Sequence, residues 1–287
     1  MPPLSSADHL SSPPTVTVPR DYNAAHDLIE RNLAAGRAGK IAYIDDAGSC
    51  TYGQLAERVN RAANALTGIG LVTEQRIMLC HLDTSDWAAV FLGAIKAGII
   101  PVAVNTLLTT NDYEFMLRDS RARALVVSEA LYPSFAPLIG KLPHLRQVIV
   151  SGTNSQGHLS LQDLLAKAGT SFEPAATTRD DACFWLYSSG STGVPKGTVH
   201  IHSSLIHTAE LYARPVLGIK ESDVVFSAAK LFFAYGLGNA LTFPLAVGAT
   251  TVLMAERPTP QSVFKRIREQ HPTIFYGVPT LYAALLA

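Results

Sequence analysis

The chain has 287 residues, 48% of them hydrophobic and 16% charged, which is enough to bury a sizeable core and excludes a disordered protein. Lys plus Arg and Asp plus Glu both total 23, so no net charge draws the chain to nucleic acid or to an anionic membrane. The three cysteines form no C-x-x-C pair, which argues against a disulfide framework or a zinc site and favours a reducing cytoplasm.

Residues 1–20 are expected to form a flexible leader. The stretch 1–19 is rich in Ser, Pro and Thr, and it has neither the basic start nor the apolar run of a signal peptide. The pattern of folded elements begins after it.

From residue 21 onward, short apolar segments alternate with amphipathic ones, a pattern typical of a mainly parallel sheet covered by helices. Thr51 and Gln54 have capping-box spacing, which predicts the start of a helix. Apolar residues then recur on one helical face at Leu55, Val59, Ala62 and Leu66. Gly68 and Gly70 are expected to end this helix.

A βαβ unit is predicted next. Residues 76–82 form its first strand, and 99–104, which follow Gly98, form its second, buried strand. Ser85 is expected to cap the connecting helix, which runs through Lys96.

The alternation continues to the end of the chain. Further strands are predicted at 124–128, 147–150, 183–188, 224–227, 249–253 and 273–276, and helices at 161–168 and 203–212. The chain ends at Ala287 within a helix predicted from Thr280, which suggests a truncated protein.

The polar stretch 169–181 is the best internal boundary. We therefore predict an α/β fold, with mainly parallel sheets flanked by helices, in a first subdomain at 21–178 and a second at 179–287.

Hydroxyls, glycines and one lysine are concentrated at 188–197, directly after a predicted strand. Glycines let backbone N–H groups approach phosphate oxygens, hydroxyls add donors, and Lys196 adds a mobile positive charge. The loop is not a Walker A motif, because Pro195 precedes Lys196 and a predicted strand follows Gly197. On composition alone, a flexible linker is the better explanation.

The full string Tyr187-Ser-Ser-Gly-Ser-Thr-Gly-Val-Pro-Lys-Gly197 closely resembles the phosphate-binding signature of the adenylate-forming superfamily, which contains acyl-CoA ligases, peptide-synthetase adenylation domains and luciferases. The stretch Phe91-Leu-Gly-Ala-Ile-Lys-Ala-Gly-Ile-Ile-Pro-Val-Ala-Val-Asn105 resembles the family's first core helix and strand, and Gly277-Val-Pro-Thr280 resembles a later active-site loop. The resemblance implies the two subdomains of the family's N-terminal domain. It also implies that the ATP phosphates are bound by Ser188, Ser189, Gly190, Ser191, Thr192, Gly193 and Lys196.

Three shorter strings resemble the benzoate-CoA ligase branch of this family. They are Asn105-Thr-Leu-Leu-Thr109, Asp119-Ser-Arg-Ala122 and Lys230-Leu-Phe-Phe-Ala-Tyr-Gly-Leu-Gly-Asn239. In that branch, residues matching Ala234 and Tyr235 line the pocket for the aromatic acid, and a flat apolar slot suits a ring with one carboxylate. An aromatic core cluster is the alternative interpretation of these residues.

The resemblance implies two half-reactions. The carboxylate of an acid attacks the α-phosphorus of MgATP to give acyl-AMP and pyrophosphate, and the thiol of CoA then displaces AMP. ATP and CoA are bound as substrates, Mg²⁺ is bound with ATP, and no tightly bound prosthetic group is implied. Alignment and charge neutralisation carry both steps, so no catalytic residue is assigned.

By the family pattern, the acidic magnesium ligand, the carboxylate that binds ribose and the C-terminal domain with the adenylation lysine lie beyond Ala287. Lys196 is not that lysine, because its motif matches the phosphate loop. The chain alone is therefore expected to be a poor enzyme.

His200 and His202 alternate on a predicted strand and could face one metal ion. No third ligand accompanies them at metal spacing, so a scaffolding role is favoured and no metal site is assigned.

Several alternatives stay open. The acid could be a fatty acid or an amino acid, or the chain could be an inactive nucleotide-binding or dimerising fragment. A membrane-associated protein rests only on the uncharged stretch 231–255, which glycines and Pro244 interrupt. We expect small-molecule substrates and neither nucleic acid nor membrane as partners, and a homodimer is left open.

Overall fold

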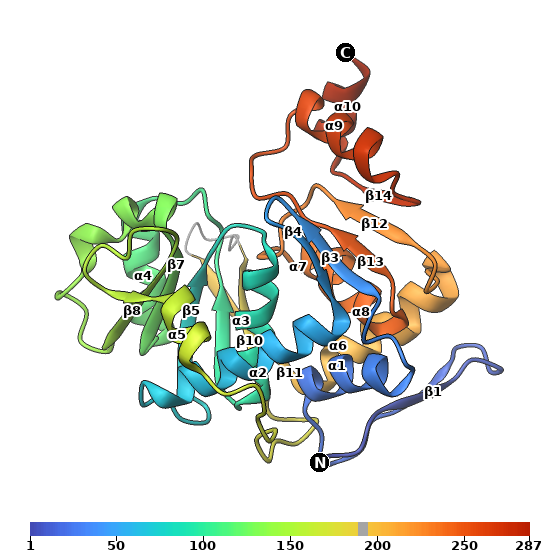
Figure 1. The fold of residues 1–287 in the computed structure, drawn as a ribbon, viewed down its shortest axis with the longest axis horizontal. Helices are drawn as coiled ribbons and strands as arrows, with labels where there is room; N and C mark the ends of the chain where they lie inside the picture. Colours follow the sequence, from blue (N-terminus) through green and yellow to red (C-terminus); the bar gives the residue numbers. More distant parts are fainter. Residues whose placement is uncertain (189–194) are drawn as a thin grey trace.

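The computed structural model describes residues 1–188 and 195–287. They form two large β-sheets and a separate two-stranded one, with helices packed between and around the large sheets (Figure 1), which confirms the predicted α/β class. Within the described residues, the first sheet has seven strands in the order β11-β10-β6-β5-β7-β8-β9. These strands are β5 (Arg76–Cys80), β6 (Ile100–Ala103), β7 (Ala124–Ser128), β8 (Gln147–Ser151), β9 (Leu159–Ser160), β10 (Ala182–Ser188) and β11 (Lys196–Ile201).

The second sheet has five strands among the described residues, in the order β14-β12-β13-β3-β4. They are β3 (Ile41–Asp45), β4 (Gly48–Thr51), β12 (Val224–Ser227), β13 (Thr250–Val252) and β14 (Ile274–Tyr276). β3 runs parallel to β13 with Tyr43 opposite Thr251, and β4 returns antiparallel to β3. A hairpin from the start of the chain therefore joins strands from its end.

Each of the two large sheets contains strands from both sides of the expected boundary at residue 178. β10 lies parallel to β6, with Trp185 opposite Val102, and β11 pairs antiparallel with β10 at the sheet edge. Both late strands thus extend the sheet built by the earlier segment, while β3 and β4 belong to the other sheet. The division into subdomains at 21–178 and 179–287 stays a prediction.

Helices cover both sheets. The α-helices are α1 (Ala24–Ala34), α2 (Tyr52–Gly68), α3 (Ser85–Lys96), α4 (Thr110–Ser120), α5 (Leu161–Lys167), α6 (His202–Thr208), α7 (Ala234–Leu237), α8 (Phe243–Val247), α9 (Pro260–Gln270) and α10 (Pro279–Leu286). The described residues also form two 3₁₀ segments, η1 (Glu129–Ser134) and η2 (Ala136–Leu138), and two π-helical segments, η3 (Ala209–Leu217) and η4 (Gly238–Thr242).

The predicted capping box at Thr51 and Gln54 is present at the start of α2. The predicted cap at Ser85 was wrong, because Ser85 is the first residue of α3 and Thr84 is its N-cap. Asp45 from the β3–β4 hairpin accepts the Ser85 N–H at 2.8 Å and supplies the acceptor that a local cap would provide. This contact links α3 to the second sheet.

The main core lies where α1, α2 and α3 cross the middle of the molecule (Figure 1). Trp87 stacks on Phe91 with ring centroids 4.8 Å apart, and Phe91 meets Phe184 of β10 edge to face at 5.5 Å. All three rings are buried. Aromatic packing of this kind supports β10 from the side of the core.

The stretch expected to be a flexible leader contains a short hairpin, β1 (Ser6–Asp8) paired with β2 (Thr15–Thr17). Ser5 donates to Asp27 at 2.5 Å, and His9 contacts Glu210 at 2.8 Å. Both carboxylates are buried and need such partners, which is the physical reason for these contacts.

None of the helices in the described ranges is both long and apolar enough to cross a membrane. The uncharged stretch 231–255 is divided among α7, η4, α8 and β13, with Gly248 in a left-handed conformation after α8 (φ 85°).

Candidate functional site

The two arms of the predicted phosphate loop lie side by side. Ser188 is the last residue of β10, Lys196 is the first residue of β11, and the antiparallel register places them opposite each other. Both are exposed. The other predicted phosphate ligands, Ser189, Gly190, Ser191, Thr192 and Gly193, lie outside the described residues.

Gly197 allows the two arms to approach closely. A Cβ at this position would lie 3.1 Å from the Trp185 ring and 3.4 Å from the Tyr187 ring. Tyr187 itself donates from its hydroxyl to Asp119 at 2.7 Å, and burial together with that bond raises the pKa of Tyr187. The phenol therefore stays protonated, and it ties the loop arm to the end of α4.

An apolar cavity of about 110 Å³ lies between the β10–β11 edge and the helices α6, α7 and α8. Its lining includes Phe184, Leu186, His200, Ala234, Leu237 and Phe243. The His200 imidazole stacks on Phe184 with centroids 4.5 Å apart and ring planes 2° apart. Burial lowers the pKa of His200, so this wall is a flat, neutral surface.

Tyr235, the second predicted pocket residue, lies beside this cavity but does not line it. Its ring meets Tyr276 edge to face, with centroids 6.3 Å apart, and about half of Tyr235 is exposed. Tyr276 is buried, and its hydroxyl has no hydrogen-bond partner within the described residues. The predicted pair therefore borders a cavity on one side and an unpaired phenol on the other.

Sequence reasoning did not name Phe184 or Tyr276 as site residues. Two signals could have found them. Phe184 and Leu186 alternate on one face of the strand that leads into the phosphate loop, and Tyr276 directly precedes the Gly277-Val-Pro-Thr280 string.

The two histidines weighed as metal ligands have separate roles. His202 begins α6, and its Nδ1 accepts the Ala24 N–H at 3.1 Å. Burial lowers the pKa of His202 to about 4, so the acceptor nitrogen is unprotonated at neutral pH. Across residues 1–188 and 195–287, no group of three or more His, Cys, Asp or Glu side chains is arranged to hold a metal ion.

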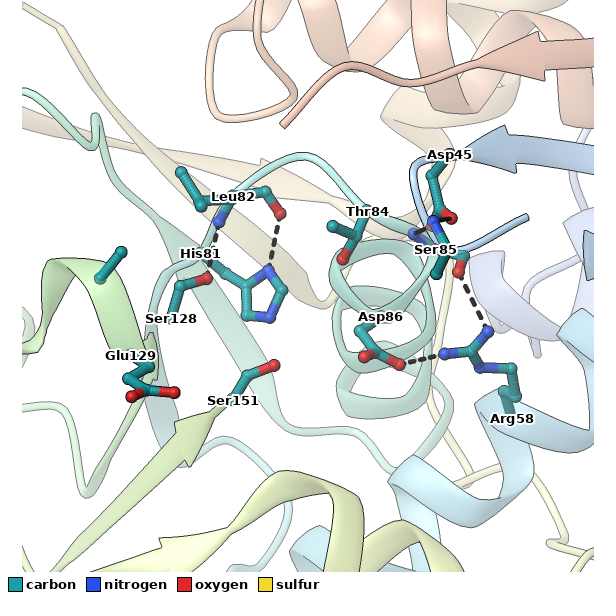
Figure 2. A pocket seen from close by; sticks show the side chains of 12 residues that line it. Asp45, Arg58, His81, Leu82, Thr84, Ser85, Asp86, Ser128, Glu129 and Ser151 are labelled. Carbon is teal, nitrogen blue, oxygen red and sulfur yellow. Dashed lines mark hydrogen bonds and ion pairs between the residues drawn. The ribbon is translucent and has the colours of Figure 1, made fainter. Parts of the chain in front are cut away.

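A larger cavity of about 460 Å³, lined mainly by polar residues, lies at the carboxyl ends of β5, β7 and β8 (Figure 2). Its charged side chains are engaged locally: Arg58 pairs with Asp86, and Glu129 accepts the Thr153 N–H at 2.8 Å. The Nδ1 atom of His81 lies 2.7 Å from the Leu82 carbonyl oxygen. None of the described residues predicted for phosphate or acid binding lines this cavity.

The comparison with known proteins decides the family. A sequence profile described as AMP-binding enzyme matches residues 30–287, which is most of the chain. The chain belongs to this AMP-binding enzyme family. The phosphate-loop arms and the apolar cavity both fall within the matched region.

Several relatives in the family are named for aromatic acids. The chain is 65% identical over 285 residues to a benzoate–CoA ligase of Thauera aromatica, covering 99% of the chain and 54% of that protein. It is 50% identical over 268 residues to a 4-hydroxybenzoate–CoA/benzoate–CoA ligase of Rhodopseudomonas palustris, covering 93% of the chain and 50% of that protein.

Solved structures of AMP-binding relatives agree with the fold. A benzoate CoA ligase from Burkholderia xenovorans LB400 superposes with a TM-score of 0.86 at 52% identity, over 93% of this chain and 52% of that one. The anthranilate CoA ligase AuaEII, in complex with anthranoyl-AMP, superposes with a TM-score of 0.91 at 40% identity, over 94% and 52%. The chain thus spans about half the length of the relatives it matches.

Proposed function

We propose that the protein activates a benzoate-like aromatic carboxylic acid with MgATP, forming acyl-AMP and pyrophosphate, and then passes the acyl group to the thiol of CoA. The observation that carries this proposal is that the same two strands, β10 and β11, bear the phosphate-loop arms and one wall of the apolar cavity. Phe184 and Ser188 are separated by four residues, roughly 13 Å along the strand. An acid and a triphosphate can therefore be held next to each other.

The cavity supports an aromatic ring as the bound group. An apolar cavity of about 150 Å³ holds benzene, and the volume of about 110 Å³ found here is nearer to the size of one ring than to that of a long acyl chain. The flat stack of His200 on Phe184 adds a planar wall. A single ring with one carboxylate is therefore favoured over a fatty acid.

The phosphate-loop arms support ATP as the second substrate. Lys196 is exposed and opposite Ser188, so its ammonium group and the serine hydroxyl can both reach phosphate oxygens. Magnesium would arrive as MgATP, with phosphate oxygens among its ligands. The relatives' names support CoA as the acyl acceptor.

The test is acid-dependent release of pyrophosphate from MgATP, measured in parallel with benzoate, 4-hydroxybenzoate, a fatty acid and an amino acid. It is made on this chain and on the protein encoded by the complete gene. Release with the aromatic acids, followed by CoA thioester formation, is the expected result for the second protein. Release with the fatty or amino acid alone would overturn the substrate class.

A further inference from the structure

Asp83 lies in the loop between β5 and α3 and contacts the turn that carries Ala234 and Tyr235. It is 3% exposed, and its two carboxylate oxygens lie 3.4 and 3.2 Å from the backbone nitrogen of Leu231, whose N–H they accept. Leu231 is fully buried and precedes Ala234 by three residues. A side chain that follows a strand of the first sheet thus holds the start of the predicted acid-site turn.

The other anchors of this turn come from the second sheet or its connections. The Ala228 N–H donates to the Tyr276 carbonyl at 2.9 Å. The ammonium group of Lys230 donates to the Met254 carbonyl and, at 2.7 Å, to the Glu256 carbonyl. Asp83 therefore adds the cross-link from the seven-stranded sheet.

The turn has little freedom to absorb a shift at Leu231. The Phe233 N–H donates to the Lys230 carbonyl at 3.0 Å, and the Leu237 N–H donates to the Phe233 carbonyl at 2.7 Å. A Cβ added to Gly236 would collide with the Lys230 carbonyl oxygen. Because the turn closes against itself, moving Leu231 moves Ala234 with it.

A stabilising role does not explain why a carboxylate occupies the buried position 83. Burial raises the pKa of Asp83 to about 7, with the Lys230 charge and the Leu231 N–H acting in the opposite direction. A buried carboxylate with so few partners costs free energy that an apolar side chain would not. Its contribution is better sought in the geometry of the turn.

We propose that Asp83 is a positioning residue for acid selectivity: by holding the Leu231 N–H, it fixes the place of Ala234 and Tyr235 without touching the acid. This inference rests on the proposed function and deepens it. It assigns part of the specificity for the ring to a residue of the other sheet.

The test compares Asp83→Ala and Asp83→Asn in the protein encoded by the complete gene. We expect Asp83→Ala to raise KM for benzoate about tenfold, because it removes the acceptor of the buried Leu231 N–H, and to change the benzoate to 4-hydroxybenzoate preference. KM for MgATP should stay within about twofold. Asp83→Asn keeps an oxygen acceptor and should restore both KM and preference.

Asp86→Asn is the matched control. Asp86 lies three residues further on, and its ion pair is with Arg58 of α2 and not with the turn. An equal fall in kcat for every acid in Asp83→Ala, with the acid preference unchanged, would reduce Asp83 to a structural role and overturn the proposal. Wild-type kinetics in Asp83→Ala would overturn it as well.

Amide hydrogen exchange of the segment 228–237 in this chain gives a readout that does not depend on the substrate. Exchange should accelerate in Asp83→Ala and stay slow in Asp83→Asn. Unchanged exchange in Asp83→Ala contradicts the positioning role whatever the acid. Absence of benzoate-dependent pyrophosphate release in the wild-type protein, by contrast, rejects the proposed function itself.

Discussion

Lys196 is the residue on which the proposed phosphate contacts depend most. Replacing it with Ala removes a charge-assisted contact, and we expect KM for MgATP in the protein encoded by the complete gene to rise at least about tenfold. The melting temperature should not change, since the side chain is exposed and no ion pair of the structure includes it among the described residues. The measurement is pyrophosphate release at varied MgATP. Lys196→Arg, which keeps the charge, is the control, and wild-type kinetics in Lys196→Ala would remove this lysine from the ATP site.

Ala234 tests the acid cavity by volume. A phenyl group in place of its methyl group would occupy much of a cavity of about 110 Å³. We expect Ala234→Phe to abolish turnover of benzoate while leaving the affinity for MgATP, measured by equilibrium binding, unchanged. Ala234→Ser, of nearly unchanged size, should keep most of the benzoate turnover. Equal turnover in Ala234→Phe would place the ring elsewhere.

His202 links α6 to α1, because its Nδ1 accepts an N–H from the first turn of α1. Its pKa falls to about 4 on burial, below the ordinary 6.5. Because this pKa is lower in the folded state, the unfolded chain takes up the proton at a higher pH. The contribution of neutral His202 to the free energy of unfolding is therefore fully present above about pH 6.5 and is lost as the pH falls toward 4. The contribution is up to about 3 kcal/mol.

We therefore expect His202→Gln to lower the unfolding free energy at pH 7.5 and to weaken the loss of stability between pH 6.5 and 4.5. Urea unfolding at both values measures this difference. His207→Gln on the same helix is the control and should leave the pH dependence as in the wild type. Identical pH dependence in His202→Gln and the wild type would contradict the assignment.

At the scale of elements, local sequence signals predicted most of the strands and several helices. The strands at 124–128 and 224–227 agree with β7 and β12 to the residue, and the capping box of α2 is present. These elements carry strong local patterns, either a short β-branched run or a cap followed by apolar periodicity. Predictions from such signals agree with the folded structure because the local preference and the tertiary environment favour the same conformation.

Some details that the sequence did not indicate depend on distant partners. α3 is capped by Asp45, about 40 positions earlier in the chain, which no local pattern indicates. The helix predicted to end near residue 212 continues as η3 to Leu217, and Pro215 within it cannot donate a backbone hydrogen bond. The candidate site shows the same limit, since Ala234 and Phe184 meet only when the two sheets are assembled.

In the whole molecule, each large sheet needs strands from both halves of the chain. We therefore predict that residues 1–178 will not fold alone. Without β10, the edge of β6 is uncovered, and without β13, the β3–β4 hairpin has no parallel partner. We expect this fragment to aggregate or to melt without cooperativity, whereas the 287-residue chain melts cooperatively. Calorimetry and circular dichroism of both measure the difference. A soluble, cooperative 1–178 fragment would show that the first sheet is self-sufficient.

The pairing of β3 with β13 also sets a delay during synthesis. The hairpin at 41–51 leaves the ribosome early, but the strand it needs, Thr250–Val252, is made about 200 residues later. At about 5–20 residues per second, this interval lasts roughly 10 to 40 s. During that time the hairpin has an open edge of backbone donors and acceptors, which can pair with the wrong strand in crowded conditions. The edge of the hairpin is therefore exposed for a time that depends on the speed of translation.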